Sequence, residues 1–257
     1  NLLKINGVES VMSIVDAPLV ESSDIPISEI VDNVPTLLSG NIDIDGYSLS
    51  GLNGSGSNGY GIYSYFNDIS IEDGALNLLG AGGHNGSNNI GIHSTNGSLS
   101  ATGSAQPVIY LSGYGEGGGG ASGDNNHGIN ILGTLLTNSG SMPFFDTSIN
   151  LYGGSGAGIS YGIALDSGNI ATVDSGISID AFSAGVSEGL YIGNLMTIGS
   201  PSQSGYIMID APNGVMNNAG SSALQTSGNW YIYADDPYSV SLGGLIYDFK
   251  EYNVSDI

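Results

Sequence analysis

The chain has 257 residues, of which 24 are acidic and two are basic, so its formal net charge is −22. The two basic residues are Lys4 and Lys250, too few to bind the phosphates of a nucleic acid. Anionic membrane surfaces would repel so acidic a chain. Without cysteine there is no disulfide, thiol chemistry or Cys-bearing zinc site. No apolar run reaches the ~18 residues of a membrane span, so membrane insertion is not expected.

Residues 1–39 differ in composition from the rest of the chain. They are poor in glycine and contain Pro18, Pro26 and Pro35 without a helical period. We predict an extended N-terminal cap, or an arm that pairs with another subunit by adding a strand to an open sheet edge. The chain begins at Asn1 without a methionine or a leader pattern, which we expect of a processed product or of a piece of a longer protein.

Residues 40–228 contain two interleaved repeats with a period of about thirty residues. Hydrophobic triplets begin at intervals of 34, 33, 40, 28 and 30 residues, at Ile42, Leu76, Ile109, Ile149, Ile177 and Ile207. Between them lies a glycine followed by Ile or Leu, at Gly61, Gly91, Gly128, Gly162 and Gly189. Such a recurrence is the signature of a repeat architecture.

Each period divides into three short strands, for example residues 91–93, 97–100 and 109–111, whose apolar residues alternate with small or polar ones. Glycine, asparagine and aspartate at the corners provide left-handed backbone conformations. The sequence therefore predicts an all-β fold, a right-handed parallel β-helix with three strands per turn, almost no α-helix, and atypical N- and C-terminal caps. The apolar residues of each turn should point inward and stack on their equivalents in neighbouring turns.

Residues 229–257 are predicted to form a last strand and an aromatic cap on the open end. Their pattern is a Trp-x-x-Tyr strand, an Asp-Pro turn, a Gly-Gly-Leu and a Phe-x-x-Tyr, carried by Trp230, Tyr233, Asp236, Pro237, Gly243, Gly244, Leu245, Phe249 and Tyr252. This stretch of about 25 residues resembles a segment of the filamentous-haemagglutinin-like exoproteins, the adhesins of bacterial two-partner secretion. The resemblance implies a secreted β-helical adhesin at a bacterial cell surface. The family's N-terminal secretion domain is not evident, and basic residues are unusually depleted.

The acidic residues offer a candidate Ca²⁺ site but no catalytic apparatus. Asp68, Glu72 and Asp73 cluster at one corner and Asp124 precedes two asparagines at another, and carboxylate and amide oxygens suit Ca²⁺. A polysaccharide lyase would need Arg or Lys to stabilise its anionic intermediate, and the chain lacks them there. Hydrolysis by two carboxylates remains the enzymatic alternative, but no pair can be recognised from the sequence.

Histidines and tyrosines complete the candidate residues. His93 and His127 lie beside equivalent Gly-Ile positions, so they could approach one another on neighbouring turns, whereas a metal site would need a further ligand; His84 is the third histidine. Tyr63, Tyr110 and Tyr191 alternate with apolar residues, so they could face outward and bind a glycan or a protein.

We therefore expect a secreted, extracellular, non-enzymatic adhesin or structural segment at a bacterial cell surface, with Ca²⁺ as the only candidate cofactor. Its partners would be a glycan or protein on a host or neighbouring cell, or copies of itself. Two alternatives stay open: a fibre subunit that stacks head to tail, and a carbohydrate-binding or carbohydrate-active β-helix.

Overall fold

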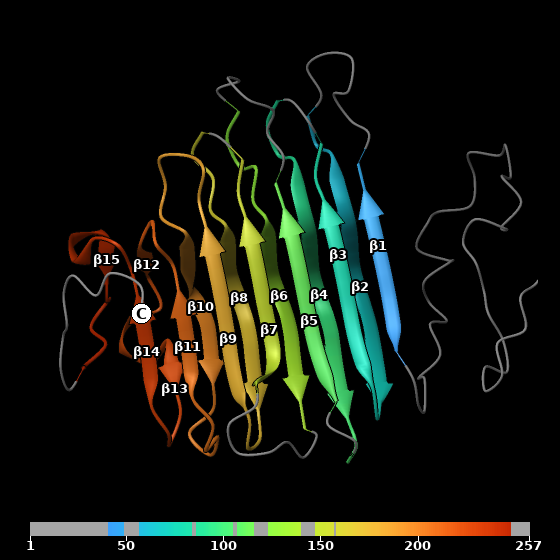
Figure 1. Cartoon of the computed structure of the whole chain (residues 1–257), viewed down its shortest axis with the longest axis vertical. Coiled ribbons are helices and arrows are strands. Elements are labelled where there is room, and N and C mark those ends of the chain that lie inside the picture. Colours follow the sequence, from blue (N-terminus) through green and yellow to red (C-terminus); the bar gives the residue numbers. More distant parts are fainter. Residues whose placement is uncertain are drawn as a thin grey trace, which may run out of the picture. The chain divides into compact units, whose positions relative to one another are not determined.

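The chain folds into two facing sheets of parallel strands (Figure 1). The computed structural model describes residues 41–48, 57–83, 86–104, 107–115, 123–139, 147–156 and 158–247. The predicted N-terminal cap or arm, residues 1–39, lies outside them. The described residues contain no α-helix, only the short 3-10 helices η2 (Gly220–Ser222) and η3 (Pro237–Ser239). No helix in this part of the chain has the length and apolar character needed to span a membrane.

The first sheet, which we call the short-strand sheet, is ordered β1-β3-β5-β7-β9-β11-β14, and each strand pairs in parallel with its neighbours. Its strands are β1 (Ile42–Tyr47), β3 (Ala75–Ala81), β5 (Val108–Tyr114), β7 (Thr147–Gly154), β9 (Gly176–Phe182), β11 (Ile207–Asp210) and β14 (Trp230–Tyr233).

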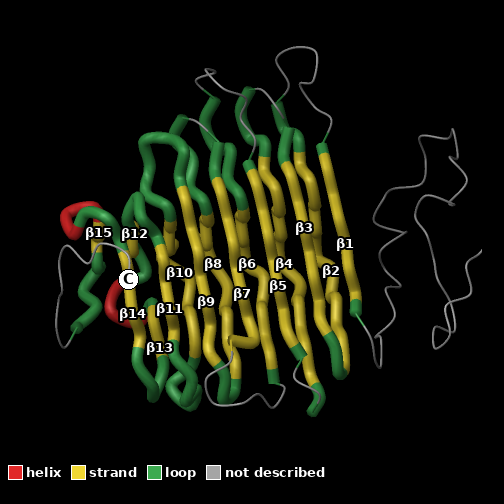
Figure 2. Tube along the Cα trace, in the orientation of Figure 1, coloured by secondary structure: helices red, strands yellow, loops and turns green. Residues whose placement is uncertain are grey.

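The second sheet, the long-strand sheet, is ordered β2-β4-β6-β8-β10-β12-β15 and is also parallel. Its strands are β2 (Tyr60–Glu72), β4 (Ile90–Thr102), β6 (Ile129–Asn138), β8 (Ile163–Thr172), β10 (Leu190–Gly199), β12 (Val215–Asn217) and β15 (Val240–Ser241), and β13 (Leu224–Gln225) pairs with β10. The chain alternates between the two sheets, with connections at both ends of the strands (Figure 2). The structure is thus a nearly all-β coil with parallel sheets, compatible with a parallel β-helix.

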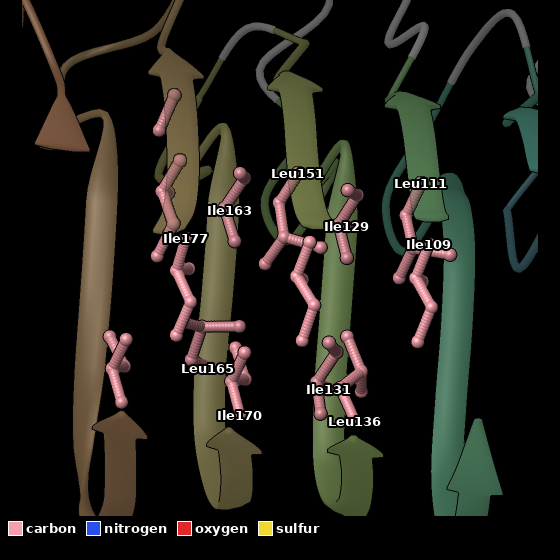
Figure 3. Close-up of a cluster of buried hydrophobic side chains, with 14 of the residues drawn as sticks. Ile109, Leu111, Ile129, Ile131, Leu136, Leu151, Ile163, Leu165, Ile170 and Ile177 are labelled. Carbon is pink, nitrogen blue, oxygen red and sulfur yellow. The ribbon is translucent and has the colours of Figure 1, made fainter. Parts of the chain in front are cut away.

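The hydrophobic triplets stack in register, as their spacing predicts. Ile109 pairs with Leu76 on one side and with Ile149 on the other. The inward residues of both sheets form one hydrophobic core between the layers (Figure 3). Leu111, Ile129 and Ile163, for example, are completely buried.

The other two predicted segments of each turn lie in a single long strand. Residues 91–93 and 97–100, expected as separate strands, both belong to β4. Each turn of the described structure therefore contributes one strand to each of two sheets. The long strands are nevertheless irregular in the middle, where Asn96, Gly133 and Gly168 adopt positive φ of 55°, 75° and 124°.

The two glycine series of the sequence meet where the sheets approach each other. A Cβ atom on Gly113, which ends a triplet strand, would overlap the carbonyl oxygen of Gly128, which opens a Gly-Ile strand. The same relationship holds one turn earlier between Gly80 and Gly91. Glycine recurs here because any side chain would separate the two sheets.

The C-terminal segment contributes a further turn to the coil. β14 pairs with β11, so Trp230 continues the column of Ile207 and packs, partly buried, against the core. The Asp236 carboxylate accepts from the Tyr238 N–H at 2.9 Å and caps η3. Leu245, after the positive-φ Gly243 and Gly244, is 7% exposed and belongs to the core cluster.

Candidate functional site

The outer face of the long-strand sheet contains an open hollow of about 470 Å³. We call it the tyrosine–histidine hollow, after the rings that dominate its lining. It is lined by Tyr60, Asn88, Ile90, His93, Asn125, His127, Asn130, Tyr161, Ala164, Asp166 and Tyr191.

The strand register explains why a hollow forms there. One outward column of the sheet runs Tyr63, His93, Asn130, Ala164, Tyr191 across β2, β4, β6, β8 and β10. The side chains at its two ends are rings, whereas Asn130 and Ala164 in the middle are small. Strands lie about 4.8 Å apart, so two small residues in succession leave a gap roughly two strands wide between the aromatic groups.

One wall of the hollow is a stack of three rings. The His127 and Tyr161 ring centroids are 5.6 Å apart with planes at 12°, and those of Tyr161 and Tyr191 are 5.1 Å apart. The backbone N–H of Tyr161 donates to Nδ1 of His127 at 3.0 Å, which fixes the orientation of the imidazole.

The opposite wall is also aromatic. The ring of His93 stacks on Tyr63 with centroids 5.2 Å apart and also contacts Tyr60, at 5.5 Å. Nε2 of His93 lies 2.8 Å from Oγ1 of Thr95. The hollow is therefore bounded at both ends by rings whose orientation is set by neighbouring groups.

An asparagine ladder forms the side of the hollow at the corner that precedes the long strands. Nδ2 of Asn125 donates to Oδ1 of Asn88, and Nδ2 of Asn88 donates to Oδ1 of Asn58, each at 3.2 Å. All three residues have positive φ near 60°, a conformation that asparagine tolerates better than most residues. The ladder holds amide groups at the rim.

Two polar atoms at the hollow have no partner in the described structure. Nδ1 of His93 and Oδ1 of Asn130 are both buried and make no hydrogen bond with the described residues. Unpaired buried polar atoms are uncommon because each costs about 1–3 kcal/mol. Both residues line the hollow, but neighbouring groups cover these two atoms, so they lie beneath its surface.

Asp166 supplies the carboxylate of the hollow, and a bulge brings it there. Ile131 of β6 pairs with Leu165 and Leu132 pairs with Ser167, which leaves Asp166 as an extra residue of β8. Bulges of this kind re-aim a side chain. Burial raises the pKa of Asp166, and its charge in turn contributes to the raised pKa of Tyr161, which is due first to burial.

Both histidines of the hollow are neutral at pH 7. Burial lowers the pKa of His93 below its ordinary value of 6.5 and takes that of His127 to about 4. The site therefore combines aromatic faces, amides, neutral imidazoles and one carboxylate.

Three of the four residues predicted to bind Ca²⁺ accept hydrogen bonds from backbone or hydroxyl groups. Asp68 accepts from Oγ of Ser98 at 2.7 Å, Asp73 from the N–H of Ser104 at 2.6 Å, and Asp124 from the N–H of Ile159 at 2.9 Å, while Glu72 is exposed. In the described ranges no three acidic or histidine side chains gather in a way that could hold a metal ion. Calcium binding at these four residues stays a prediction.

The predicted cap residues are only partly described. Trp230 and Tyr233 lie in β14, where Trp230 is half-buried and Tyr233 is exposed, and Pro237 begins η3. Phe249 and Tyr252 lie outside the described residues, as does His84.

Part of the hollow could be found from the sequence. His93 and His127 both line it, although the register pairs His93 with Asn130 and not with His127. The Tyr63 ring stacks on His93 at its edge, whereas Tyr110 lies on the short-strand sheet. Asp166 could not be found, because a bulge leaves no mark in a spacing pattern. Tyr60 and Tyr161 are not predicted either, although each of these rings directly precedes a glycine of the Gly-Ile series.

Two aromatic walls with amides and a carboxylate between them can bind a ligand that has both apolar faces and many polar groups. Such a hollow can orient a ligand through the amides of Asn88 and Asn125 and the carboxylate of Asp166. No family model matches the chain, and the searches of curated proteins and of solved structures likewise find no match.

Proposed function

We propose that this chain is a non-enzymatic β-helical adhesin segment, secreted to a bacterial surface, that binds a glycan in the tyrosine–histidine hollow. The observation that carries the proposal is the pair of aromatic walls, His93 with Tyr63 and Tyr161 with Tyr191, on either side of a polar lining. A volume of about 470 Å³ lies within the ~300–1,000 Å³ of small-molecule sites.

Sugars match this chemistry more closely than apolar ligands do. The C–H faces of a pyranose ring pack on aromatic rings, and its hydroxyls need the donors and acceptors that the rim provides. Asn88 and Asn125 present amides on one side and Tyr161 and Tyr191 present stacked rings on the other. An apolar ligand would cover the Asp166 carboxylate and the rim amides without pairing them, at a cost in affinity.

The lining of the hollow favours binding of a glycan over its hydrolysis. Glycosidases generally use two carboxyl groups about 5–9.5 Å apart. Asp166 is the one carboxylate among the lining residues, and burial raises its pKa. We therefore propose that the ligand is held and not cleaved.

For the fold, we propose the finer architecture of a right-handed β-helix with three strands per turn. The positive φ of Asn96, Gly133 and Gly168 halfway along β4, β6 and β8 supports a corner that divides each long strand in two. Parallel strands joined by a crossover within one sheet are right-handed in ≈ 98% of cases, which supports the handedness.

The surface location rests on sequence features. The C-terminal pattern from Trp230 resembles adhesins of two-partner secretion, and a net charge of −22 favours a protein that stays soluble outside the cell. The partner would then be a glycan of a host or neighbouring cell.

Calorimetric titration with a panel of soluble oligosaccharides tests glycan binding by the full chain. Tyr161→Ala and Tyr191→Ala should each weaken binding at least about fivefold, because truncating a central aromatic contact costs more than about 1 kcal/mol. Tyr110→Ala, on the outer face of the short-strand sheet, removes an equally large ring and should leave affinity unchanged. Equal losses in all three variants, or no glycan bound by the parent chain, would refute the proposal.

Self-assembly is the second candidate, supported by the terminal strands of the short-strand sheet. β1 and β14 are its end strands in the described structure. Their inward residues, such as Ile44 and Ile232, are only partly buried, whereas Leu111 and Ile179 in the interior strands are completely buried. A second copy could cover these edges by continuing the parallel ladder. Analytical ultracentrifugation from low to high concentration tests this, and a monomer throughout would retire it.

A further inference from the structure

We infer that the hollow selects glycans that carry a free primary ammonium group, an amino sugar whose nitrogen is not acetylated, through pairing with the carboxylate of Asp166. This inference rests on the proposed glycan binding and specifies the class of sugar.

The position of Asp166 in the sheet favours such pairing. The bulge that places it in the hollow involves both neighbouring strands, since Gly193 and Asn194 of β10 together face this single residue. A Cβ atom on Gly193 would overlap the backbone of Asp166, so the glycine permits the close approach that the bulge requires. Two adjacent strands are thus adapted to one carboxylate that lies at the ligand site.

The described part of the chain offers Asp166 no cationic side chain. Lys4 and Lys250 are the only basic residues of the sequence apart from histidine, and both lie outside the described residues. Burial keeps His93 and His127 neutral at pH 7, with the pKa of His127 at about 4. Partial burial of the Asp166 carboxylate costs free energy, and no cation in the described structure offsets that cost. The ammonium group of a ligand would offset it.

The aromatic wall beside Asp166 also favours a cation. Tyr161 contacts Tyr191 and lies close enough to Asp166 for the carboxylate to raise its pKa, after the larger effect of burial. An ammonium group beside Asp166 is therefore within reach of aromatic faces, which attract cations at distances up to about 6 Å. Glu188 also acts on Tyr161, so the local field at this end is negative. Uronic and sialic acids would be repelled here.

Three hexasaccharides that differ only at C2 test the inference: the β-1,4-linked hexamers of glucose, N-acetylglucosamine and glucosamine. Binding to the full chain is measured by calorimetry at pH 6 and 0.15 M salt, where charges more than about 8 Å apart are largely screened. The glucosamine hexamer should bind about tenfold or more tightly than the other two, the strength expected of a partly buried charge-assisted contact. In Asp166→Asn the glucosamine hexamer should bind no more tightly than the glucose hexamer, so the preference is lost.

A polycation could also bind an acidic protein at many places, and Asp235→Asn controls for this. Asp235 is exposed and lies outside the hollow, between β14 and η3, so its loss removes the same charge without touching the site. If Asp166→Asn and Asp235→Asn weaken glucosamine binding equally, the contact is non-specific and the inference fails. Equal affinity for all three hexamers would overturn the ammonium preference while leaving glycan binding intact. Failure of all three hexamers and of the wider oligosaccharide panel to bind would overturn both.

Discussion

The backbone N–H of Tyr161 donates to Nδ1 of His127 at 3.0 Å, and the two rings stack with centroids 5.6 Å apart. A single contact between adjacent turns thus fixes the imidazole as an acceptor at Nδ1 and builds one wall of the hollow. Protonation at Nδ1 would place two N–H groups against each other. The protonation state of His127 and the integrity of the hollow should therefore be coupled.

The stability of the protein should fall between pH 6.5 and pH 4 because of His127. Burial lowers the pKa of His127 in the fold to about 4 from an ordinary 6.5. Between these pH values the imidazole is protonated in the unfolded chain and neutral in the folded chain. Stability contributed by the neutral ring is complete above pH 6.5 and is lost as the pH falls towards 4, by up to roughly 3 kcal/mol.

Urea denaturation at pH 7 and at pH 4.5 measures this effect in the parent chain and in His127→Gln. The variant should lose much less stability between the two pH values. Burial raises the pKa values of Asp166 and Asp180, which act with the opposite sign and favour the fold at acid pH, but both proteins contain them. An identical acid-induced loss in both proteins would show that His127 is not the responsible group.

Gly113→Ala should destabilise the fold strongly, because its Cβ would overlap the backbone of Gly128 where the two sheets approach. Backbone cannot move aside as a flexible side chain can, so we expect a loss of about 2–3 kcal/mol. Gly154→Ala is the matched control in the next turn, since its Cβ would meet only the ring of Tyr114 at an ordinary 3.5 Å. Thermal unfolding of both variants checks the prediction, and equal melting temperatures would contradict it.

Asn126 and Asn125 are neighbours with different structural roles, and alanine variants should separate them. Asn126 is fully buried; its Oδ1 accepts from the N–H of Asn89, and its Nδ2 donates to the carbonyls of Gly86 and Gly123. Asn126→Ala leaves these backbone groups unpaired, so we expect a loss of about 3 kcal/mol or more in the free energy of unfolding.

Asn125→Ala removes an exposed rung of the outer ladder, where water can replace the lost donor to Oδ1 of Asn88. Alanine at its positive φ adds strain, so the loss should be about 1–2 kcal/mol. Urea denaturation of the two variants in parallel makes the comparison. Similar losses would mean that the buried amide does not hold the corner.

The repeat could be predicted from the sequence because its physical cause is local. Ile109 and Leu111 are separated by one outward residue, and their stacking on Ile149 and Leu151 follows from the spacing of the triplets. The role of the glycines is not evident from the sequence, since Gly113 and Gly128 are fifteen positions apart and meet only across the coil. The continuity of the long strands is not evident either, because Asn96 and Gly97 have the composition of a turn and yet lie within β4.

The hollow could be anticipated only in part, because it depends on which turns become neighbours. Turn lengths vary from 28 to 40 residues between triplets, so the alignment of His93 with Asn130 and of Ala164 with Tyr191 needs the strand register. The two small residues that open the hollow carry no signal of their own in the sequence. The position of Asp166 is harder still to predict, since Asp166 is itself the extra residue of β8 that has no partner in β6.

The most direct test of glycan binding in the hollow is an amide chemical-shift map of the full, isotope-labelled chain titrated with the glucosamine and glucose hexamers. We expect the perturbed amides to cluster at His93, His127, Asn130, Tyr161 and Tyr191 on the outer face of the long-strand sheet. Amides of Tyr110 and Tyr231 on the short-strand sheet should not move. Perturbations confined to the short-strand sheet, or none at saturating sugar, would contradict the account.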